Sequence, residues 1–441
     1  MSDVDDFSTD SHDRAETALR EMLERATASE PPMGPMAQNA LLAGIRRRRR
    51  RQAGAAAVCA AVVTAIAVTV PAVTGTHRTT AASGTSGGSG GLTDHATVFV
   101  SSVSAYPHAD TVVLTPIAAA TNKPERPITI GGGPDNLAIT PNGKIIYVME
   151  FGNLDAIIPV STVTHRAGAP ITVGDNPSDI AFAPDGKTAY VLCESQVTPV
   201  NIATGTPGTP IRINEPNLAG LGITPDGKTL YVSTLRDAVV PIDTATDRAG
   251  KPIKVGSEPT TYVFSRDGKT AYVINTSSDT VSPIDTATNT AGPAIKVGLG
   301  PVSMAITPDG KTLYVVNQLS NTVTPINTAT NTPGPAIKVG RNPVGIVITP
   351  NGKTIYVPDQ SANATTSQLS DVTPINTATN TVRPPIPVGL FPRGIAITPD
   401  GQTVYVAGNA GNTVTPIDTA TNTAELAIKV APGPEAIVIA P

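Results

Sequence analysis

Some short stretches of this chain place chemically useful residues at suggestive spacings. Residues 222–229 match the phosphate-binding pattern in which two glycines, separated by four residues, precede a lysine and a threonine. A phosphate loop of this kind needs a helix after the lysine, whose amide groups then face the phosphate. Here Leu230, Tyr231 and Val232 continue as an apolar strand, and Pro225 lacks an amide proton. We therefore expect no nucleotide site.

Metal ligands and nucleophiles are sparse. After residue 94 the histidines are His95, His108 and His165, and they form no cluster with metal-ligand spacing. The two cysteines, Cys59 and Cys193, fall in regions that should not meet, so we predict no disulfide. Cys193 stands where sister repeats have asparagine, which favours a small buried residue over a nucleophile. The sequence predicts no metal and no cofactor.

Lysines recur after the turn glycines of the repeats: Lys144, Lys187, Lys228, Lys269, Lys311 and Lys353. In a ring-shaped fold they would form a circle on one face, either as solvated turn residues or as a docking ring for an anionic surface. The first interpretation is favoured. The formal net charge of -4 and the pI near 5.8 give no indication of nucleic-acid binding.

The lysines belong to a repeat that organises most of the chain. At residues 304–316 an apolar strand, a Pro-Asp-Gly turn and a second apolar strand predict a β-hairpin. Its tyrosine returns at positions 147, 190, 231, 272, 314, 356 and 405, at intervals of 41 to 43 residues except for a last interval of 49. That period is typical of propeller blades.

Each repeat contains four predicted strands, and each strand type occurs eight times. We therefore predict an all-β fold, a β-propeller of eight four-stranded blades, with seven blades as the alternative. The first strand of the domain (residues 96–103) is of the second type, and its last strand (residues 435–440) is of the first type. One blade should combine the two, because this pairing covers two exposed strand edges.

The repeat units resemble the YVTN family of β-propeller proteins. Tyr314-Val-Val-Asn317 is similar to the Tyr-Val-Thr-Asn core of that family, and Pro308-Asp-Gly-Lys311 is similar to its turn. The resemblance covers residues 95–441 and implies a propeller fold. It leaves function open, because the family includes surface proteins and binding domains. The chain departs from the core asparagine at Glu150, Cys193, Thr234 and Asp359.

The N-terminal region differs in kind. Residues 1–52 are a polar tail that is predicted to form two short amphipathic helices, and six consecutive arginines stand at 46–51. Residues 53–73 carry no charge and are long enough for one transmembrane helix. The arginines predict a cytoplasmic N-terminus and an extracytoplasmic propeller at residues 95–441, after a Gly/Ser/Thr-rich linker at 74–94. A cleaved signal peptide is the alternative. The Ala-, Thr- and Arg-rich composition suits a high-GC bacterium.

Loops that differ among otherwise similar repeats are the candidate binding site. In a propeller, the loops before the innermost strand and after the second strand emerge on the same face. The candidate residues for binding a ligand or partner are Asp135, Glu150, Asp179, Arg236, Arg341, Phe391, Arg393 and Glu435. The alternative is sequence drift on a surface without a partner.

Three functions compete. The leading hypothesis is a monomeric, membrane-anchored propeller that binds an unknown protein or cell-envelope ligand. The alternative is a lactonase- or lyase-type enzyme with a site in the central channel, which some propellers have. In the third, the tail recruits a cytoplasmic regulator and the chain acts as a sensor. We expect no catalytic residues and no nucleic-acid partner.

Overall fold

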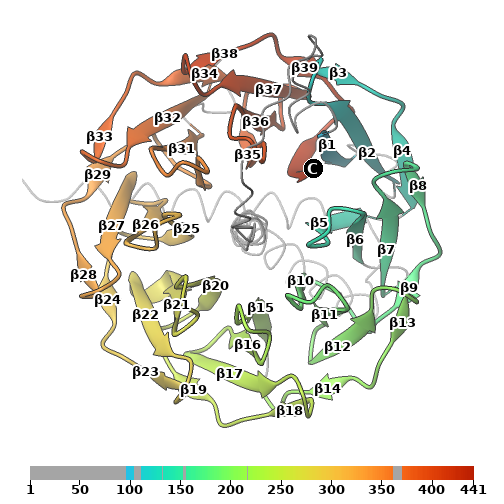
Figure 1. The fold of residues 1–441 in the computed structure, drawn as a ribbon, viewed down its shortest axis with the longest axis vertical. Coiled ribbons are helices and arrows are strands. Elements are labelled where there is room, and N and C mark those ends of the chain that lie inside the picture. Colours follow the sequence, from blue (N-terminus) through green and yellow to red (C-terminus); the bar gives the residue numbers. More distant parts are fainter. Residues whose placement is uncertain (1–95, 104–110, 132, 152–154, 216, 361–369) are drawn as a thin grey trace, which may run out of the picture. The chain divides into compact units, whose positions relative to one another are not determined.

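The computed structural model describes residues 96–103, 111–131, 133–151, 155–215, 217–360 and 370–441. Within these ranges the chain forms strands β1 to β40 and one short 3-10 helix, η1 (Thr276–Ser278). The strands group into eight antiparallel sheets around a central axis (Figure 1). The predicted eight-bladed, all-β propeller is thus confirmed. The predicted tail, membrane span and linker (residues 1–94) lie outside the described residues.

Each blade places its strands in the same order from the axis outward. The innermost strands are β5 (Gly133–Ile139), β10 (Asp179–Phe182), β15 (Leu218–Ile223), β20 (Pro259–Phe264), β25 (Pro301–Ile306), β30 (Val347–Ile348), β35 (Pro392–Ile397) and β40 (Pro434–Ala440). The second strands are β6 (Ile145–Phe151), β11 (Thr188–Leu192), β16 (Thr229–Thr234), β21 (Thr270–Asn275), β26 (Thr312–Asn317), β31 (Thr354–Asp359), β36 (Thr403–Gly408) and β1 (Thr97–Val103). The third strands are β7 (Ala156–Ser161), β12 (Gln196–Asn201), β17 (Ala238–Asp243), β22 (Thr280–Asp285), β27 (Thr322–Asn327), β32 (Ser370–Asn376), β37 (Thr413–Asp418) and β2 (Thr111–Ala118).

The fourth position is split into two short pieces, both paired with the third strand. These pieces are β8 (Arg166–Ala167) and β9 (Ile171–Thr172), β13 (Thr206–Pro207) and β14 (Ile211–Arg212), β18 (Arg248–Ala249) and β19 (Ile253–Lys254), β23 (Thr290–Ala291) and β24 (Ile295–Lys296), β28 (Thr332–Pro333) and β29 (Ile337–Lys338), β33 (Thr381–Val382) and β34 (Ile386–Val388), β38 (Thr423–Ala424) and β39 (Ile428–Lys429), and β3 (Lys123–Pro124) and β4 (Ile128–Gly131). Between β23 and β24, for example, Pro293 has no amide hydrogen to donate, so the ladder is interrupted there.

The blades are numbered from the sheet that begins with β5 (blade 1) to the sheet that begins with β40 (blade 8). Blade 8 joins β40 to β1 in antiparallel register, with Thr97 opposite Ala440 and Phe99 opposite Val438. This pairing confirms the predicted closing blade. It leaves neither strand as an open edge of the sheet.

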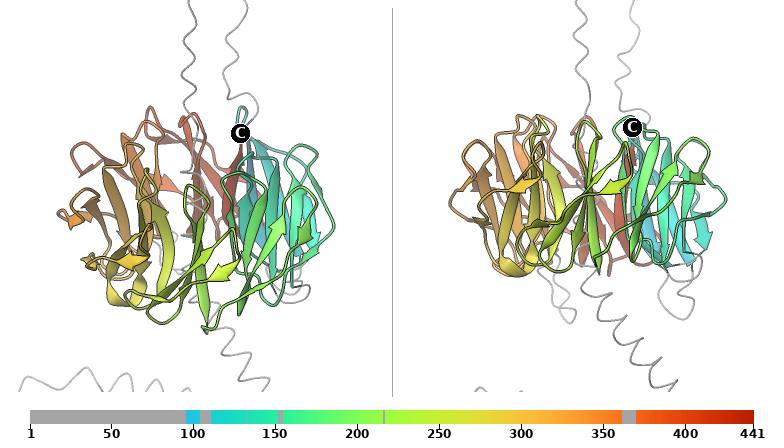
Figure 2. Two further views of the ribbon diagram at one scale, coloured as in Figure 1. Left: turned by 60° about the horizontal axis from the view of Figure 1, so that its bottom comes forward. Right: turned by 90° about the horizontal axis from the view of Figure 1, so that it is seen from below.

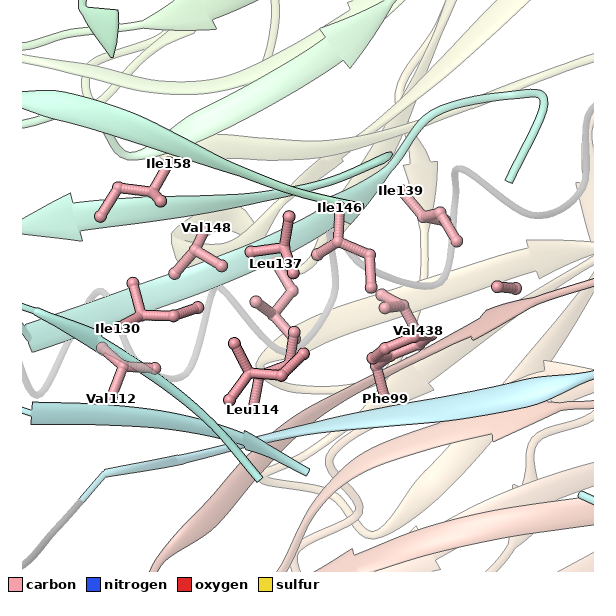
Figure 3. Close-up of a cluster of buried hydrophobic side chains, with 13 residues drawn as sticks. Phe99, Val112, Leu114, Ile130, Leu137, Ile139, Ile146, Val148, Ile158 and Val438 are labelled. Carbon is pink, nitrogen blue, oxygen red and sulfur yellow. The ribbon is translucent and has the colours of Figure 1, made fainter. Parts of the chain in front are cut away.

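Hydrophobic side chains are buried mainly between blades rather than within one. Eight clusters occur in the described residues, and each lies between two consecutive sheets. Figure 3 shows the cluster between blades 8 and 1, where Phe99 and Leu114 meet Leu137 and Ile146. One blade cannot cover its own apolar faces, so the ring is the folding unit.

The repeated tyrosine links each blade to the next. Its ring is buried, and its hydroxyl donates a hydrogen bond to an asparagine in the turn after the third strand of the following blade. The five pairs are Tyr231–Asn289 (2.6 Å), Tyr272–Asn331 (2.9 Å), Tyr314–Asn380 (2.7 Å), Tyr356–Asn422 (2.8 Å) and Tyr405–Asn122 (2.6 Å). These asparagines have φ between 53° and 56°, a left-handed conformation that asparagine tolerates well.

The junctions between blades 8 and 1 and between blades 1 and 2 lack this hydrogen bond. Phe99 has no hydroxyl, and the residue at the asparagine position of the next blade is His165, whose ring makes an edge contact with it at a centroid distance of 5.4 Å. Gly205 takes the place of the asparagine that would face Tyr147. Equivalent junctions between blades therefore form both with and without the hydrogen bond from the tyrosine hydroxyl.

We predict that Tyr314→Phe lowers the free energy of unfolding by about 1 kcal/mol, because it removes one hydrogen bond between blades 5 and 6. Asn380 is exposed, so water can replace the lost partner and the cost stays modest. The matched control is Tyr147→Phe, where glycine replaces the asparagine, and its effect should be smaller. Denaturant unfolding measures both. Equal losses in the two variants would contradict the proposed role of the pair.

Candidate functional site

The ring has two chemically different faces. The turn face carries the Pro-Asp-Gly turns between first and second strands, together with the turns after the third strands, and it is the side on which the C-terminus is marked in Figure 2. The loop face, on the opposite side, carries the loops before the first strand and after the second. Backbone hydrogen bonds join these loops in pairs, for example Gln318 N to Gly300 O (2.8 Å) and Asn409 N to Phe391 O (3.0 Å). The expectation that they emerge together is confirmed.

Four of the six predicted turn-face lysines lie beside carboxylates of their own turns, whereas Lys144 and Lys353 have asparagine in that place. Lys187, Lys228, Lys269 and Lys311 lie 3.5 to 3.9 Å from Asp185, Asp226, Asp267 and Asp309, with the lysine side chains 80 to 82% exposed. Contacts this exposed contribute little stability, but each neutralises the charge of its lysine. The structure favours solvated turn residues over a basic ring.

The aspartates of these turns have a local structural task. Asp309 accepts hydrogen bonds from the Thr307 hydroxyl (2.6 Å) and from the Lys311 amide (3.1 Å), and Gly310 follows it with φ of 74°. The Thr307 hydroxyl is the main cause of a lowered pKa for Asp309. The same chemistry returns in blade after blade, so this face offers little by which a partner could distinguish one blade from another.

Asp179 lies in the wall between blades 2 and 3 rather than on the loop surface. It is 8% exposed, and its two oxygens accept hydrogen bonds from the Ile180 amide and from the Leu221 amide of β15, both at 2.8 Å. Burial raises the pKa of its carboxyl to about 6. Because one oxygen is bonded within β10 and the other joins β10 to β15, we assign Asp179 no part in the exposed surface.

The other predicted residues are spread around the loop face. Asp135 and Glu150 belong to β5 and β6, and their side chains lie outside the described part of the structure. Arg236 is exposed in the loop after β16, and Arg341 is exposed in the loop before β30. The eight residues predicted as a binding site therefore do not form one compact site.

Arg393 and Glu435 are the two predicted side chains that the fold brings to adjacent positions. Each follows the proline that begins its innermost strand, in the neighbouring strands β35 and β40. A Cβ atom added at Gly394 would meet the Glu435 carbonyl oxygen at 2.7 Å, so the two backbones lie in close contact there. Arg393 is half-buried, and its Nε has no hydrogen-bond partner within the described ranges.

Phe391 occupies a position that takes asparagine or glycine in most other blades and Glu258 in blade 4. Its φ is 53°, a conformation that is unusual for a bulky side chain. The equivalent residues of other blades include Asn176, Asn342 and Gly300, all with positive φ. A strained aromatic residue next to the proline before Arg393 marks this loop as chemically distinct.

Asp359 is a notable polar residue that the sequence marked only as a departure from the repeat. In blades 4 and 5 the equivalent Asn275 and Asn317 each donate to two hydroxyl groups, at 2.9 to 3.1 Å. Asp359 is fully buried and instead accepts a bond of 2.5 Å from the Thr373 hydroxyl. Its cross-strand neighbour is Asp371, where the sister blades have threonine. Burial first, and the Asp371 charge to a lesser extent, raises the pKa of Asp359 to about 7.

Among the residues that the structure describes, no group of three or more His, Cys, Asp or Glu side chains converges in a way that would hold a metal ion. The same part of the chain contains no helix that is long and apolar enough to cross a membrane. The predicted span at residues 53–73 lies outside it.

We predict that Asp359→Asn removes a pH dependence of stability. The folded pKa of about 7 exceeds the ordinary value of 3.8, so above pH 4 the unfolded chain releases a proton that the folded chain keeps. The stabilisation is complete below pH 4 and is lost as the pH rises through 7. Between pH 5 and 8 the unmodified chain should lose about 2 kcal/mol more unfolding free energy than the variant. Exposed Asp400→Asn is the control, and parallel pH profiles would contradict the assignment.

A sequence model described as "Lactonase, 7-bladed beta-propeller" matches residues 286–440, which is less than half of the chain. The match begins after the third strand of blade 4 and ends at β40. No curated protein matches the chain at a significant level.

Several solved structures are similar to this chain at low sequence identity. The dihydro-heme d1 dehydrogenase NirN in complex with DHE is 11% identical, with a TM-score of 0.64, over 78% of this chain and 75% of that chain. A functionally unknown protein from Desulfotomaculum acetoxidans DSM 771 is 15% identical, with a TM-score of 0.51, over 78% of this chain and 98% of that one. Kuenenia stuttgartiensis hydrazine synthase is 25% identical, with a TM-score of 0.49, over 59% and 88%. The chain is a β-propeller repeat protein with eight blades, where the matching family description names seven.

Proposed function

We propose that this chain is a binding module that recognises a protein or cell-envelope ligand through its loop face. The carrying observation is the contrast between the two faces. The turn face repeats closely similar turns, with aspartate and lysine paired in blades 2 to 5, whereas the loop face carries different side chains in each blade. Specific recognition needs such asymmetry, because identical blades would offer a partner several equivalent positions.

The loop face is also preorganised. Side chains at the ends of second strands donate to the proline carbonyl that begins the next innermost strand: Thr276 to Pro301 (3.1 Å), Gln360 to Pro392 (2.9 Å) and Asn409 to Pro434 (3.2 Å). These bonds tie neighbouring blades together directly beneath the loops. A surface held in this way loses little conformational freedom when a partner binds.

We further propose that residues 53–73 anchor the chain in a membrane, with the propeller outside the cytoplasm and monomeric. The Ala96 carbonyl accepts a hydrogen bond from the Ala119 amide (3.0 Å), in the turn after the third strand of blade 8. The described part of the chain therefore begins at the turn face, with Ala96. Attachment there leaves the loop face free for a partner.

The alternative function is a lactonase-type enzyme, which the family match over residues 286–440 favours. Its site would lie in the central channel. Hydrolysis assays of the purified chain on a panel of lactones, with and without added divalent metal, discriminate the two functions. Turnover that survives loop-face substitution would support the enzyme.

We predict that the double variant Arg341→Ala, Arg393→Ala weakens capture of a partner from cell-envelope extract by tenfold or more. A triple variant of Lys228, Lys269 and Lys311 to alanine, on the turn face, should leave capture unchanged. Both variants should retain the melting temperature of the original chain within a few degrees, because neither set is part of a hydrophobic cluster. The reverse order of effects would assign binding to the turn face.

For the membrane anchor, protease added to intact cells should cut the linker and release a propeller fragment while the N-terminal tail stays protected. Detection of both ends with separate epitope tags measures this. Release of an intact domain without protease would show that the apolar segment is a cleaved signal.

A further inference from the structure

Two leucines lie exposed side by side on the loop face of blade 5. Leu299 is 55% exposed and Leu319 is 72% exposed. The Leu319 amide donates to the Leu299 carbonyl at 3.1 Å, and a Cβ atom added to Gly300 would meet Leu319 Cγ at 2.6 Å. Both belong to the large hydrophobic side chains that are exposed in the described ranges, and the backbone hydrogen bond between them places them next to each other. Neither leucine belongs to the buried hydrophobic clusters on the two sides of blade 5.

Hydrogen bonds connect this pair to blade 6. Asn321, two residues after Leu319, accepts through Oδ1 a bond of 2.7 Å from the Asn342 amide. Asn342 follows the exposed Arg341. The arginine is thereby held beside the loop that carries Leu319.

The connection continues to blade 7. The Asn342 side chain donates to Gln360 at 2.6 Å, and Gln360 donates to the Pro392 carbonyl at 2.9 Å. Pro392 lies between half-buried Phe391 and Arg393. The apolar and cationic side chains of blades 5 to 7 therefore share one hydrogen-bonded base. We call this surface the Leu–Arg sector, which comprises Leu299, Leu319, Arg341, Leu390, Phe391 and Arg393.

Charge separates this sector from the opposite side of the same face. The described loop residues around the sector (298–300, 318–321, 340–342, 360, 389–391 and 409–412) contain arginine but no Asp or Glu. Two acids lie at its edges: Asp279 accepts a hydrogen bond of 2.7 Å from the Gly300 amide, and Glu435 is next to Arg393 in the neighbouring strand. The loops of blades 2 to 4 carry the exposed acids Asp175, Glu194, Asp237 and Glu258, with Arg236 as the one loop base among them. An anionic membrane surface laid across the face would be repelled by those acids, whereas a narrower polypeptide can contact the sector alone.

We propose that the Leu–Arg sector docks a segment of a partner protein that presents apolar side chains beside a carboxylate. The proposal rests on the binding function proposed above and names the chemistry of its partner. The leucines and Phe391 supply apolar area, which dominates affinity once buried. Arg341 and Arg393 pair with the carboxylate, and arginine suits this role because its planar guanidinium binds carboxylates with two parallel hydrogen bonds.

The test uses the full chain and three fluorescent peptides of equal length. The first alternates leucine with aspartate, the second has lysine in place of aspartate, and the third has serine in place of leucine. Fluorescence anisotropy should show the first binding at least tenfold more tightly than the other two. Leu319→Asp should reduce its affinity at least tenfold, as should Arg341→Glu, while Lys311→Glu on the turn face should leave it unchanged.

The proposal would be overturned by equal binding of the lysine and aspartate peptides, by no effect of Leu319→Asp, or by sedimentation of the chain as a dimer that Leu319→Asp dissociates. Binding of phosphatidylglycerol vesicles that depends on Leu319 would also overturn it and assign the sector to a membrane. If these probes fail while envelope capture still depends on Arg393, the loop face binds a partner of other chemistry and the proposed function stands. If capture depends on the turn-face lysines instead, both proposals fail.

Discussion

The hydrogen bond from a tyrosine hydroxyl in one blade to an asparagine in the next underlies the regularity of this ring. The phenol ring fills the space between two sheets, where burial raises its pKa to about 12 in Tyr314, Tyr356 and Tyr405. A buried hydroxyl needs a partner, and the left-handed turn of the following blade supplies one. Each repeat therefore carries half of a contact whose other half belongs to its neighbour. Stability accumulates at the junctions between blades rather than inside them.

The same constraint explains why the ring must close on itself. A terminal blade without a neighbour would expose both an apolar face and an unpartnered tyrosine. Pairing β40 with β1 removes that exposure, and Tyr405 then finds Asn122 across the closure. Pro441 lies against Gly143 as Pro184 lies against Gly227, so the closing junction repeats the packing of the others. Glycine is required at these turns because its φ is near 70° and a side chain would enter the neighbouring proline.

Because the junctions carry the stability, the loop face is free to vary. Phe391 stands where other blades use glycine, asparagine or glutamate, Arg393 stands where blades 5 and 6 have valine, and the sheet beneath them is unchanged. The position at the end of the second strand varies too, but inside the protein. Cys193, Thr234, Asn275 and Asp359 are all buried there. The residue type at that position depends on the hydrogen-bond partners that each blade offers. Only variation in the loops changes the surface that a partner would contact.

The periodicity of the sequence determined the eight blades, the strand order and the closing blade, because a repeated turn and alternating apolar residues act locally. The contacts that each side chain makes with other blades depend on the tertiary structure. The sequence predicts Asp179 to be a loop residue. In the structure β15 lies next to β10, so the Leu221 amide bonds to the Asp179 carboxylate, and the Asp179 side chain is buried. The outer strand of each blade is split into two pieces, because only some of its backbone amides form hydrogen bonds with the third strand. Leu319, Arg341 and Phe391 form one surface because contacts between blades bring together residues that are 22 to 72 positions apart, a separation that a local pattern does not encode.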